Sequence, residues 1–173
     1  VQMTEELDSG PIYCKEIMSL KGEVDDVWAR MVTTGIKLTR EYLKGISEGV
    51  LKPIPQPKET PTAYKRVTKK QSQIDFDMSA EKIYNVVRAM NETDPNTYVH
   101  PCYIIINDKQ LIIERASLEE QPQQKETVKL SEKFSIEDLI NLSYKVNEGL
   151  TSLYIQDQTG RKVYLRRVRV KTI

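Results

Sequence analysis

A proline-rich stretch at residues 51–62 constrains how this chain of 173 residues can fold. Its prolines stand at positions 53, 55, 57 and 61. Each proline fixes its own φ and lacks a backbone N–H, so the stretch favours an extended, stiff conformation over a helix or a central strand. We therefore expect a linker between two structured parts of the chain. The alternative interpretation is a ligand for an aromatic groove.

The part before the linker predicts a strand over residues 10–20 and one long helix over residues 23–48. Acidic residues open this helix, where they suit the positive end of the helix dipole, and Gly49 is well placed to end it. Apolar residues recur at three- and four-residue intervals, which is typical of a helix with one buried face. Trp28 lies on this apolar stripe, so we expect it in a core.

The part after the linker mixes helices and strands. Ser79 is a good N-cap for a helix over residues 80–91, and Ser135 with Asp138 predicts a capping box for a helix over residues 136–148. A short strand is expected at residues 127–130. Two β-hairpins are expected as well, one over 103–106 and 111–115 and one over 153–155 and 162–165, with a bulge near Arg166 and Arg167. The predicted fold class is therefore α+β.

The composition excludes several classes of protein. Hydrophobic residues make up 39% and charged residues 29% of the chain, which is typical of a folded protein and not of a disordered one. The formal net charge is +1, so the overall charge provides no argument for nucleic-acid binding. The sequence contains no apolar run of about 18 residues, so we expect no membrane span.

Cysteine and histidine are scarce in the chain. Cys14, Cys102 and the single His100 cannot supply the ligand sets usual for zinc, so we expect no metal site. Both cysteines are expected to be buried as small apolar residues in a reducing cytoplasm, while a disulfide is left open. His100 precedes Pro101 in a predicted loop, where a solvated or hydrogen-bonded histidine is more common than a catalytic one.

The segment at residues 5–12 favours a turn. Asp8 and Ser9 can bond their own backbone, Gly10 has free dihedral angles, and Pro11 fixes the next φ. By itself, this segment predicts an ordinary turn.

The order of the features after this turn resembles the folate-dependent formyltransferases, a family that includes methionyl-tRNA formyltransferase and the sugar-amine N-formyltransferases. These features are the long helix, the linker, a Tyr-Lys-Arg run at 64–66, an Ile-Asp-Phe run at 74–76 and a helix that holds residues 83–89. The resemblance covers about residues 1–118 and rests on several weak motifs in one order. It implies an N-formyltransferase with 10-formyltetrahydrofolate as co-substrate, an enzyme of one-carbon metabolism.

The resemblance also implies three site residues. In this family a Leu-Asp-x-Gly-x-Ile element carries a catalytic aspartate, and the matching residue is Asp8. Gly10 is implied to bind the folate by letting the backbone come close to it. Arg88 matches a position that often lies near the acceptor substrate. The alternative for Arg88 is a cation at a helix end, or an ion pair with Asp75 or Asp77.

The family's folate-binding region, with the Asn and His that complete its active site, has no counterpart in this sequence. We therefore expect the C-terminal portion of a larger enzyme, inactive by itself. Its expected parts are the remainder of an α/β catalytic domain (a hairpin plus the long helix) at 1–50, the linker at 51–62, a helix and β-hairpin that close the catalytic domain at 63–118, and a small β-rich C-terminal domain with one helix at 119–173.

The acceptor favoured by the resemblance is the amine of a nucleotide-linked amino sugar, and the alternative is methionyl-tRNA, with initiator tRNA as the partner. A non-catalytic binding module and, more weakly, a formate-releasing hydrolase are further alternatives, and a homodimer is left open. Basic residues crowd the last strand, where they predict either phosphate contacts or a charged edge strand that resists aggregation. These residues are Arg161, Lys162, Arg166, Arg167, Arg169 and Lys171.

Overall fold

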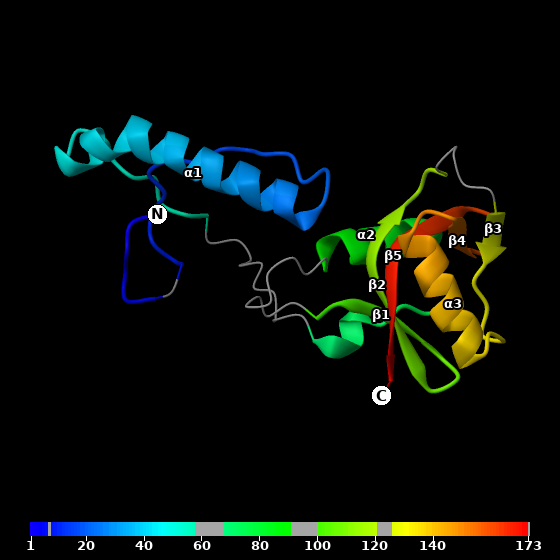
Figure 1. The fold of residues 1–173 in the computed structure, drawn as a ribbon. Helices are drawn as coiled ribbons and strands as arrows, with labels where there is room; N and C mark the ends of the chain where they lie inside the picture. Colours follow the sequence, from blue (N-terminus) through cyan, green and yellow to red (C-terminus); the bar gives the residue numbers. More distant parts are fainter. Residues whose placement is uncertain (7, 58–67, 91–99, 121–125, 173) are drawn as a thin grey trace. The chain divides into compact units, whose positions relative to one another are not determined.

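The computed structural model describes residues 1–6, 8–57, 68–90, 100–120 and 126–172. The chain forms two compact units, Val1–Lys65 and Arg66–Ile173. The first unit holds one long α-helix, and the second holds a sheet, two α-helices and the short 3-10 helix Lys69–Ser72 (Figure 1). The latter half of the expected linker, residues 58–62, lies outside the described residues.

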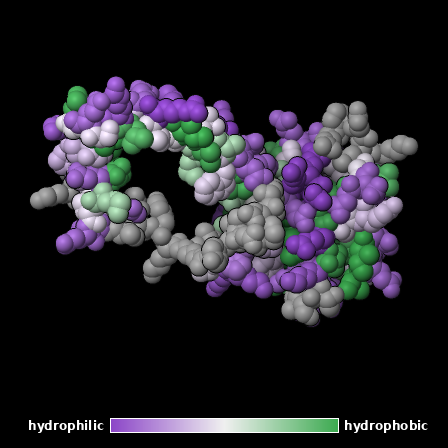
Figure 2. Space-filling view, turned by 60° about the vertical axis from the view of Figure 1, so that its left-hand side comes forward, coloured by the Kyte–Doolittle hydropathy of each residue, from purple (hydrophilic) through white to green (hydrophobic). Residues whose placement is uncertain are grey.

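The first unit is built on α1 (Val24–Ser47). Its start is closed by a reciprocal cap, in which the backbone N–H of Glu23 donates to Asp26 Oδ2 at 3.0 Å. None of its residues is buried, and Trp28 is 55% exposed, so the expectation of a core tryptophan is wrong within this unit. Other large apolar side chains of α1 are exposed too, and hydrophobic surface is visible on this unit in Figure 2.

The strand expected over residues 10–20 does not form. That segment makes a single antiparallel bridge, in which Ile12 and Ile54 exchange backbone hydrogen bonds of 2.8 and 2.9 Å. Pro53 and Pro55 flank Ile54, and within the described residues the pairing of this segment is limited to that one residue pair. The described part of the proline-rich segment, residues 51–57, contains no helix, and its Gln56 side chain bonds to the N-terminal turn.

The second unit contains one five-stranded sheet with the order β1-β2-β5-β4-β3. Its strands are β1 (Cys102–Ile106), β2 (Lys109–Ser117), β3 (Glu126–Lys129), β4 (Thr151–Gln156) and β5 (Lys162–Thr172). All neighbours are antiparallel except β3 and β4, which are parallel. The sheet joins strands from both sides of the boundary expected between residues 118 and 119, so that boundary does not divide the second unit.

The basic strand β5 is the central strand of this sheet, so its interpretation as a charged edge strand is wrong. The predicted bulge is confirmed, because Ile113 faces Val168, Arg115 faces Arg167 and Ala116 faces Leu165. The β1–β2 loop is shorter than expected. It holds only Asn107 and Asp108, whose φ values of 48° and 58° suit a two-residue hairpin turn.

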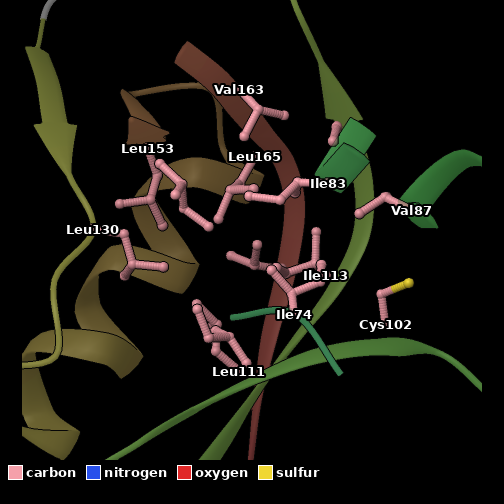
Figure 3. Close-up of a cluster of buried hydrophobic side chains, with 14 of the residues drawn as sticks. Ile74, Ile83, Val87, Cys102, Leu111, Ile113, Leu130, Leu153, Val163 and Leu165 are labelled. Carbon is pink, nitrogen blue, oxygen red and sulfur yellow. The ribbon is translucent and has the colours of Figure 1, made fainter. Parts of the chain in front are cut away.

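Two helices cover one face of the sheet. Helix α2 (Ala80–Ala89) contacts β2 and β5, and α3 (Ile136–Asn147) contacts β4 and β5. Both begin at the expected serine caps, where Ser79 and Ser135 accept from the third backbone N–H of their helices. Residue 91, the expected end of α2, lies outside the described chain. Side chains from both helices and from the sheet belong to one core, to which α3 contributes Leu139, Leu142 and Val146. Figure 3 shows part of this core, and its labelled members are Ile74, Ile83, Val87, Cys102, Leu111, Ile113, Leu130, Leu153, Val163 and Leu165.

The two cysteines differ in their surroundings. Cys102 is buried in this core, and burial raises the pKa of its thiol to about 12, so it behaves as a small apolar residue as expected. Cys14 is only partly buried, which corrects the expectation for that residue. Both are free thiols.

Asp157 ties the β4–β5 turn to the start of α2. Its Oδ2 accepts from the backbone N–H of Ala80 at 2.9 Å, and its Oδ1 accepts from the hydroxyl and backbone N–H of Thr159 and from the N–H of Arg161. These donors, first the Thr159 hydroxyl and then the Ala80 N–H, lower the pKa of Asp157 to about 2. The carboxylate therefore fixes the second hairpin against the helix.

Asn147, at the end of α3, takes the place of a strand partner for β5. Strand β4 pairs with β5 from Gln156–Lys162 to Leu153–Leu165 and goes no further. Beyond this point the Asn147 side chain donates to Val168 O at 2.8 Å and accepts from Val168 N at 3.1 Å. Ser143 Oγ donates to the same carbonyl at 2.9 Å. The amide group thus satisfies both backbone polar groups of Val168.

We predict that Asn147→Ala lowers the free energy of unfolding by roughly 1–3 kcal/mol, because it leaves a partly buried N–H without an acceptor. Chemical denaturation followed by circular dichroism measures this change. Asn141→Ala is the matched control, since Asn141 is an exposed residue of the same helix. Equal stabilities of the two variants would contradict the role given to Asn147.

Candidate functional site

The turn that carries Asp8 is held together by local hydrogen bonds. Thr4 Oγ1 donates to Glu6 O at 2.9 Å and lies 3.0 Å from Ser9 Oγ, which also donates to Glu6 O. Asp8 is exposed and has a φ of 55°, a left-handed conformation that aspartate tolerates better than most residues. The expectation of a turn is therefore confirmed for the described residues, and Leu7 of the motif lies outside them.

Gly10 is the buried member of this turn. A Cβ atom at Gly10 would lie 1.8 Å from the carbonyl oxygen of Gln2, far inside van der Waals contact. The space left by the missing side chain is therefore filled by the chain's own backbone, whose Gln2 N–H also donates to Pro11 O at 2.8 Å. Gly10 acts as a packing residue of the turn, and the folate contact implied by the resemblance stays a proposal.

The proline-rich segment clamps the same turn from the other side. Gln56 is partly buried, and its side-chain Nε2 donates to Asp8 O at 2.8 Å and to Gly10 O at 2.7 Å. The sequence pattern does not single out Gln56, because the prolines around it predict only a spacer. A glutamine between Pro55 and Pro57 was the available signal, since its side-chain amide supplies two N–H donors in a stretch poor in backbone N–H groups.

Arg88 belongs to the second unit, so the structure places it in a different unit from Asp8 and Gly10. It lies in the last turn of α2, as expected for a cation at a helix end. Its Nε donates to Asn85 Oδ1 at 2.8 Å, and its guanidinium lies 5.9 Å from the ring centre of Tyr84. His100 is exposed and precedes β1.

The outer face of the sheet, turned away from α2 and α3, presents the cations of β5. Alternation along the strand sends Val163, Leu165 and Val168 into the core, and the bulge keeps the intervening basic residues on the outer face. We call this outer surface of β5 the basic face and define it by Lys162, Arg166, Arg167, Arg169 and Lys171.

Ionic and aromatic contacts order the basic face. The Glu114 carboxylate accepts from Arg167 Nε at 3.1 Å and from Arg169 Nε at 2.9 Å. Lys162 lies 4.5 Å from the ring centre of Tyr154, and Arg166 lies 5.4 Å from that of Tyr164. Because Glu114 is shared by two guanidinium groups, the face keeps an excess of positive charge.

The two aromatic rings near the basic face differ in exposure, since Tyr154 is only partly buried. Tyr164 is buried, with 6% of its surface exposed, and burial together with Glu120 raises the pKa of its phenol. Burial also lowers the pKa of Arg166, whose guanidinium donates to the carbonyl of Glu119. Both rings already contact cations of the basic face, Tyr154 with Lys162 and Tyr164 with Arg166, so they are poorly placed to stack on bases. The basic face therefore presents mainly positive charge.

No group of His, Cys, Asp or Glu in the described residues could hold a metal ion. Within the same residues, no helix is both long enough and apolar enough to cross a membrane. The Tyr-Lys-Arg run at 64–66, on which part of the resemblance rests, lies outside the described residues.

Comparison with known proteins identifies the second unit. Residues 66–161 match the model of the formyl transferase C-terminal domain. This match covers more than half of the chain, and the resemblance found in the sequence is confirmed. The chain belongs to the formyltransferase family and contains its C-terminal domain.

Relatives of this chain are methionyl-tRNA formyltransferases. The protein of Lactobacillus acidophilus is 29% identical over 101 residues, which cover 57% of this chain and 32% of the relative. The protein of Geobacillus thermodenitrificans is 34% identical over 99 residues, which cover 56% of this chain and 30% of the relative. The chain thus spans about a third of the length of the curated relatives it matches.

Two solved structures share the fold. Methionyl-tRNA formyltransferase from Clostridium thermocellum has a TM-score of 0.54 at 22% identity and covers 68% of this chain and 48% of its own. A variant of HypX from Aquifex aeolicus has a TM-score of 0.60 at 16% identity and covers 96% of this chain and 26% of its own. The mixed α and β architecture expected from the sequence is therefore confirmed at the level of the fold.

We predict that Gly10→Ala opens the contact between the turn and the N-terminal segment, because the new methyl group meets the Gln2 carbonyl. The amide of Gln2, which donates to Pro11 O, should then exchange its hydrogen faster, as NMR can measure. Gly35→Ala is the control, because a Cβ at Gly35 meets nothing within 4 Å and alanine favours the helix there. Unchanged exchange at Gln2 in Gly10→Ala would contradict the packing role.

Proposed function

We propose that this chain is the C-terminal portion of a 10-formyltetrahydrofolate-dependent formyltransferase whose acceptor is the amine of methionyl-tRNA. The match of residues 66–161 to the formyl transferase C-terminal domain carries this proposal, together with relatives that are methionyl-tRNA formyltransferases. These relatives favour the tRNA acceptor over the nucleotide-linked amino sugar, which the sequence alone had placed first.

The basic face supports the tRNA acceptor. Affinity for nucleic acid comes mainly from cations that neutralise phosphates, and guanidinium groups bind phosphate in a planar, two-pronged geometry. Arg167 and Arg169 lie exposed on a rigid central strand, where Glu114 holds them side by side. Such a face suits contacts to the phosphate backbone of the initiator tRNA and carries no information about base sequence.

Asp8 is the residue of this chain to which we assign chemistry. Formyl transfer needs an amine that has lost its proton, and a carboxylate can accept that proton or hold a neighbouring cation in place. The exposed turn presents Asp8 on a backbone fixed from two sides, by Thr4 and Ser9 and by Gln56. Gly10 lets the backbone of Gln2 pack against the turn. The formyl donor in this proposal is the co-substrate 10-formyltetrahydrofolate.

The exposed apolar stripe of α1 supports the view that the first unit belongs to a larger α/β domain. Several large side chains of this helix are about half exposed or more, which is costly for a helix that stands free in water. These are Trp28, Met31, Val32, Ile36 and Leu43. A non-catalytic binding module is the second candidate function, and the same stripe would be its docking surface.

The acceptor is tested by comparing formyl transfer in the full-length protein to methionyl-tRNA and to a nucleotide-linked amino sugar. We expect transfer to methionyl-tRNA alone, and a loss of roughly 100-fold or more in kcat for Asp8→Asn, which keeps the shape but cannot accept a proton. Transfer to the sugar alone would overturn the acceptor. An inactive wild type would favour the binding module, and an active Asp8→Asn enzyme would remove Asp8 from the mechanism.

The tRNA contact is tested by changing the charge of the basic face. We expect Arg169→Ala to raise the KM for tRNA and to reduce the slope of log binding constant against log salt by about one. Glu114→Gln should act in the opposite direction, because it frees both arginines. Lys145→Ala is the control, since Lys145 lies on α3 and the helix covers the other face. Equal effects of Arg169→Ala and Lys145→Ala would contradict a specific role of this face.

A further inference from the structure

Gln56 contacts the candidate catalytic turn from a distant part of the sequence. It lies 48 residues after Asp8 and 46 after Gly10. One nitrogen of its side chain donates to both carbonyl oxygens, at 2.8 and 2.7 Å. The two acceptors belong to the residues on either side of Ser9. A single side-chain amide therefore restrains the backbone from Asp8 to Gly10, which includes the residue that carries the candidate carboxylate.

The other contacts of the turn do not restrain the same atoms. The hydroxyl groups of Thr4 and Ser9 bond to Glu6 O and to each other, so they tie the beginning of the turn. The Ile12–Ile54 bridge ties the chain that follows it. Asp8 lies between these two restraints, and its φ of 55° lies in the left-handed region, which non-glycine residues occupy less often than the α and β regions.

The prolines on both sides make Gln56 suited to this role. Pro55 and Pro57 have fixed φ angles, so the backbone that carries the glutamine is stiff and loses little entropy when its side chain binds. The Ile12–Ile54 bridge lies two residues before Gln56 and sets the distance between the two segments. The side-chain amide of Gln56 is therefore held near the turn by a stiff backbone.

We propose that Gln56 is a positioning residue, which holds the backbone of Asp8 so that its carboxylate meets the substrate amine in a productive geometry. The inference rests on the proposed function, because it needs Asp8 to act in formyl transfer. A displacement of about 1 Å at a reacting group can cost roughly 100-fold in rate, so a contact that fixes this backbone has a measurable effect.

Two variants remove the contact in different ways. Gln56→Glu keeps the shape but turns a double donor into an ionised acceptor that faces two carbonyl oxygens. Gln56→Met keeps the length and removes both donors without adding charge. We expect each to lower kcat in the full-length protein by roughly tenfold to 100-fold. The loss in Gln56→Glu should shrink as the pH falls from about 7.5 to 5.5, because a carboxyl without donors has a raised pKa and regains one donor when protonated.

A double-mutant cycle with Asp8→Asn separates positioning from a general structural role. If Gln56 acts through Asp8, adding Gln56→Met to Asp8→Asn should change the residual kcat by less than about twofold. A residue that merely stabilised the fold would lower the activity of both backgrounds by the same factor. Gln2→Glu is the charge control, because Gln2 is exposed and joins this segment through its backbone N–H.

The outcomes are distinct. Loss of kcat in both Gln56 variants, non-additivity with Asp8→Asn and a normal Gln2→Glu enzyme would support the inference. Wild-type kcat in Gln56→Met, or fully multiplicative losses, would overturn it while leaving the proposed function intact. An inactive wild type would overturn both. Thermal unfolding of each variant identifies any that fail to fold. If Gln56→Met does not fold, the pH dependence of kcat in Gln56→Glu tests the inference by itself. A loss of kcat that does not change with pH would contradict the role of the amide donors.

Discussion

The second unit depends on the hydrogen bonding of β5 along both of its edges. Strand β2 pairs with one edge, and β4 pairs with the first part of the other. Beyond the last pair with β4, Leu153–Leu165, the side chains of Asn147 and Ser143 of α3 bond the backbone of Val168 instead. A central strand without these partners would bury unpaired N–H and C=O groups, each of which costs about 1–3 kcal/mol.

The same strand performs two tasks, because successive side chains point to opposite faces of a sheet. One set is buried beneath α2 and α3, where each large aliphatic side chain contributes roughly 1.5–3 kcal/mol by leaving water. The other set forms the basic face, with Arg167 and Arg169 anchored on Glu114. The backbone of β5 is held in place by the core, so the cations on its other face project from a rigid strand.

Local signals in the sequence predicted most of the secondary structure. The caps at Ser79 and Ser135 and the stop after α1 depend only on neighbouring residues, so they could be recognised without the fold. The strand expected at residues 10–20 failed because a strand needs a partner along its length, and in the described residues this segment pairs only through Ile12 and Ile54. Trp28 has the right periodicity for a core, but periodicity does not show whether a partner surface is present.

Sequence alone determined the α+β class, the helices, the hairpins, the bulge in β5 and the turn that joins Asp8 to Gly10, because each follows from residues close together in the chain. Only the tertiary structure decided that β5 is central, that β3 lies parallel to β4, and that Gln56 reaches back to the turn of Asp8. These features join segments tens of residues apart. Such pairings are chosen by the burial of a common core and by the need to satisfy every buried backbone group, and neither quantity can be read from a local pattern.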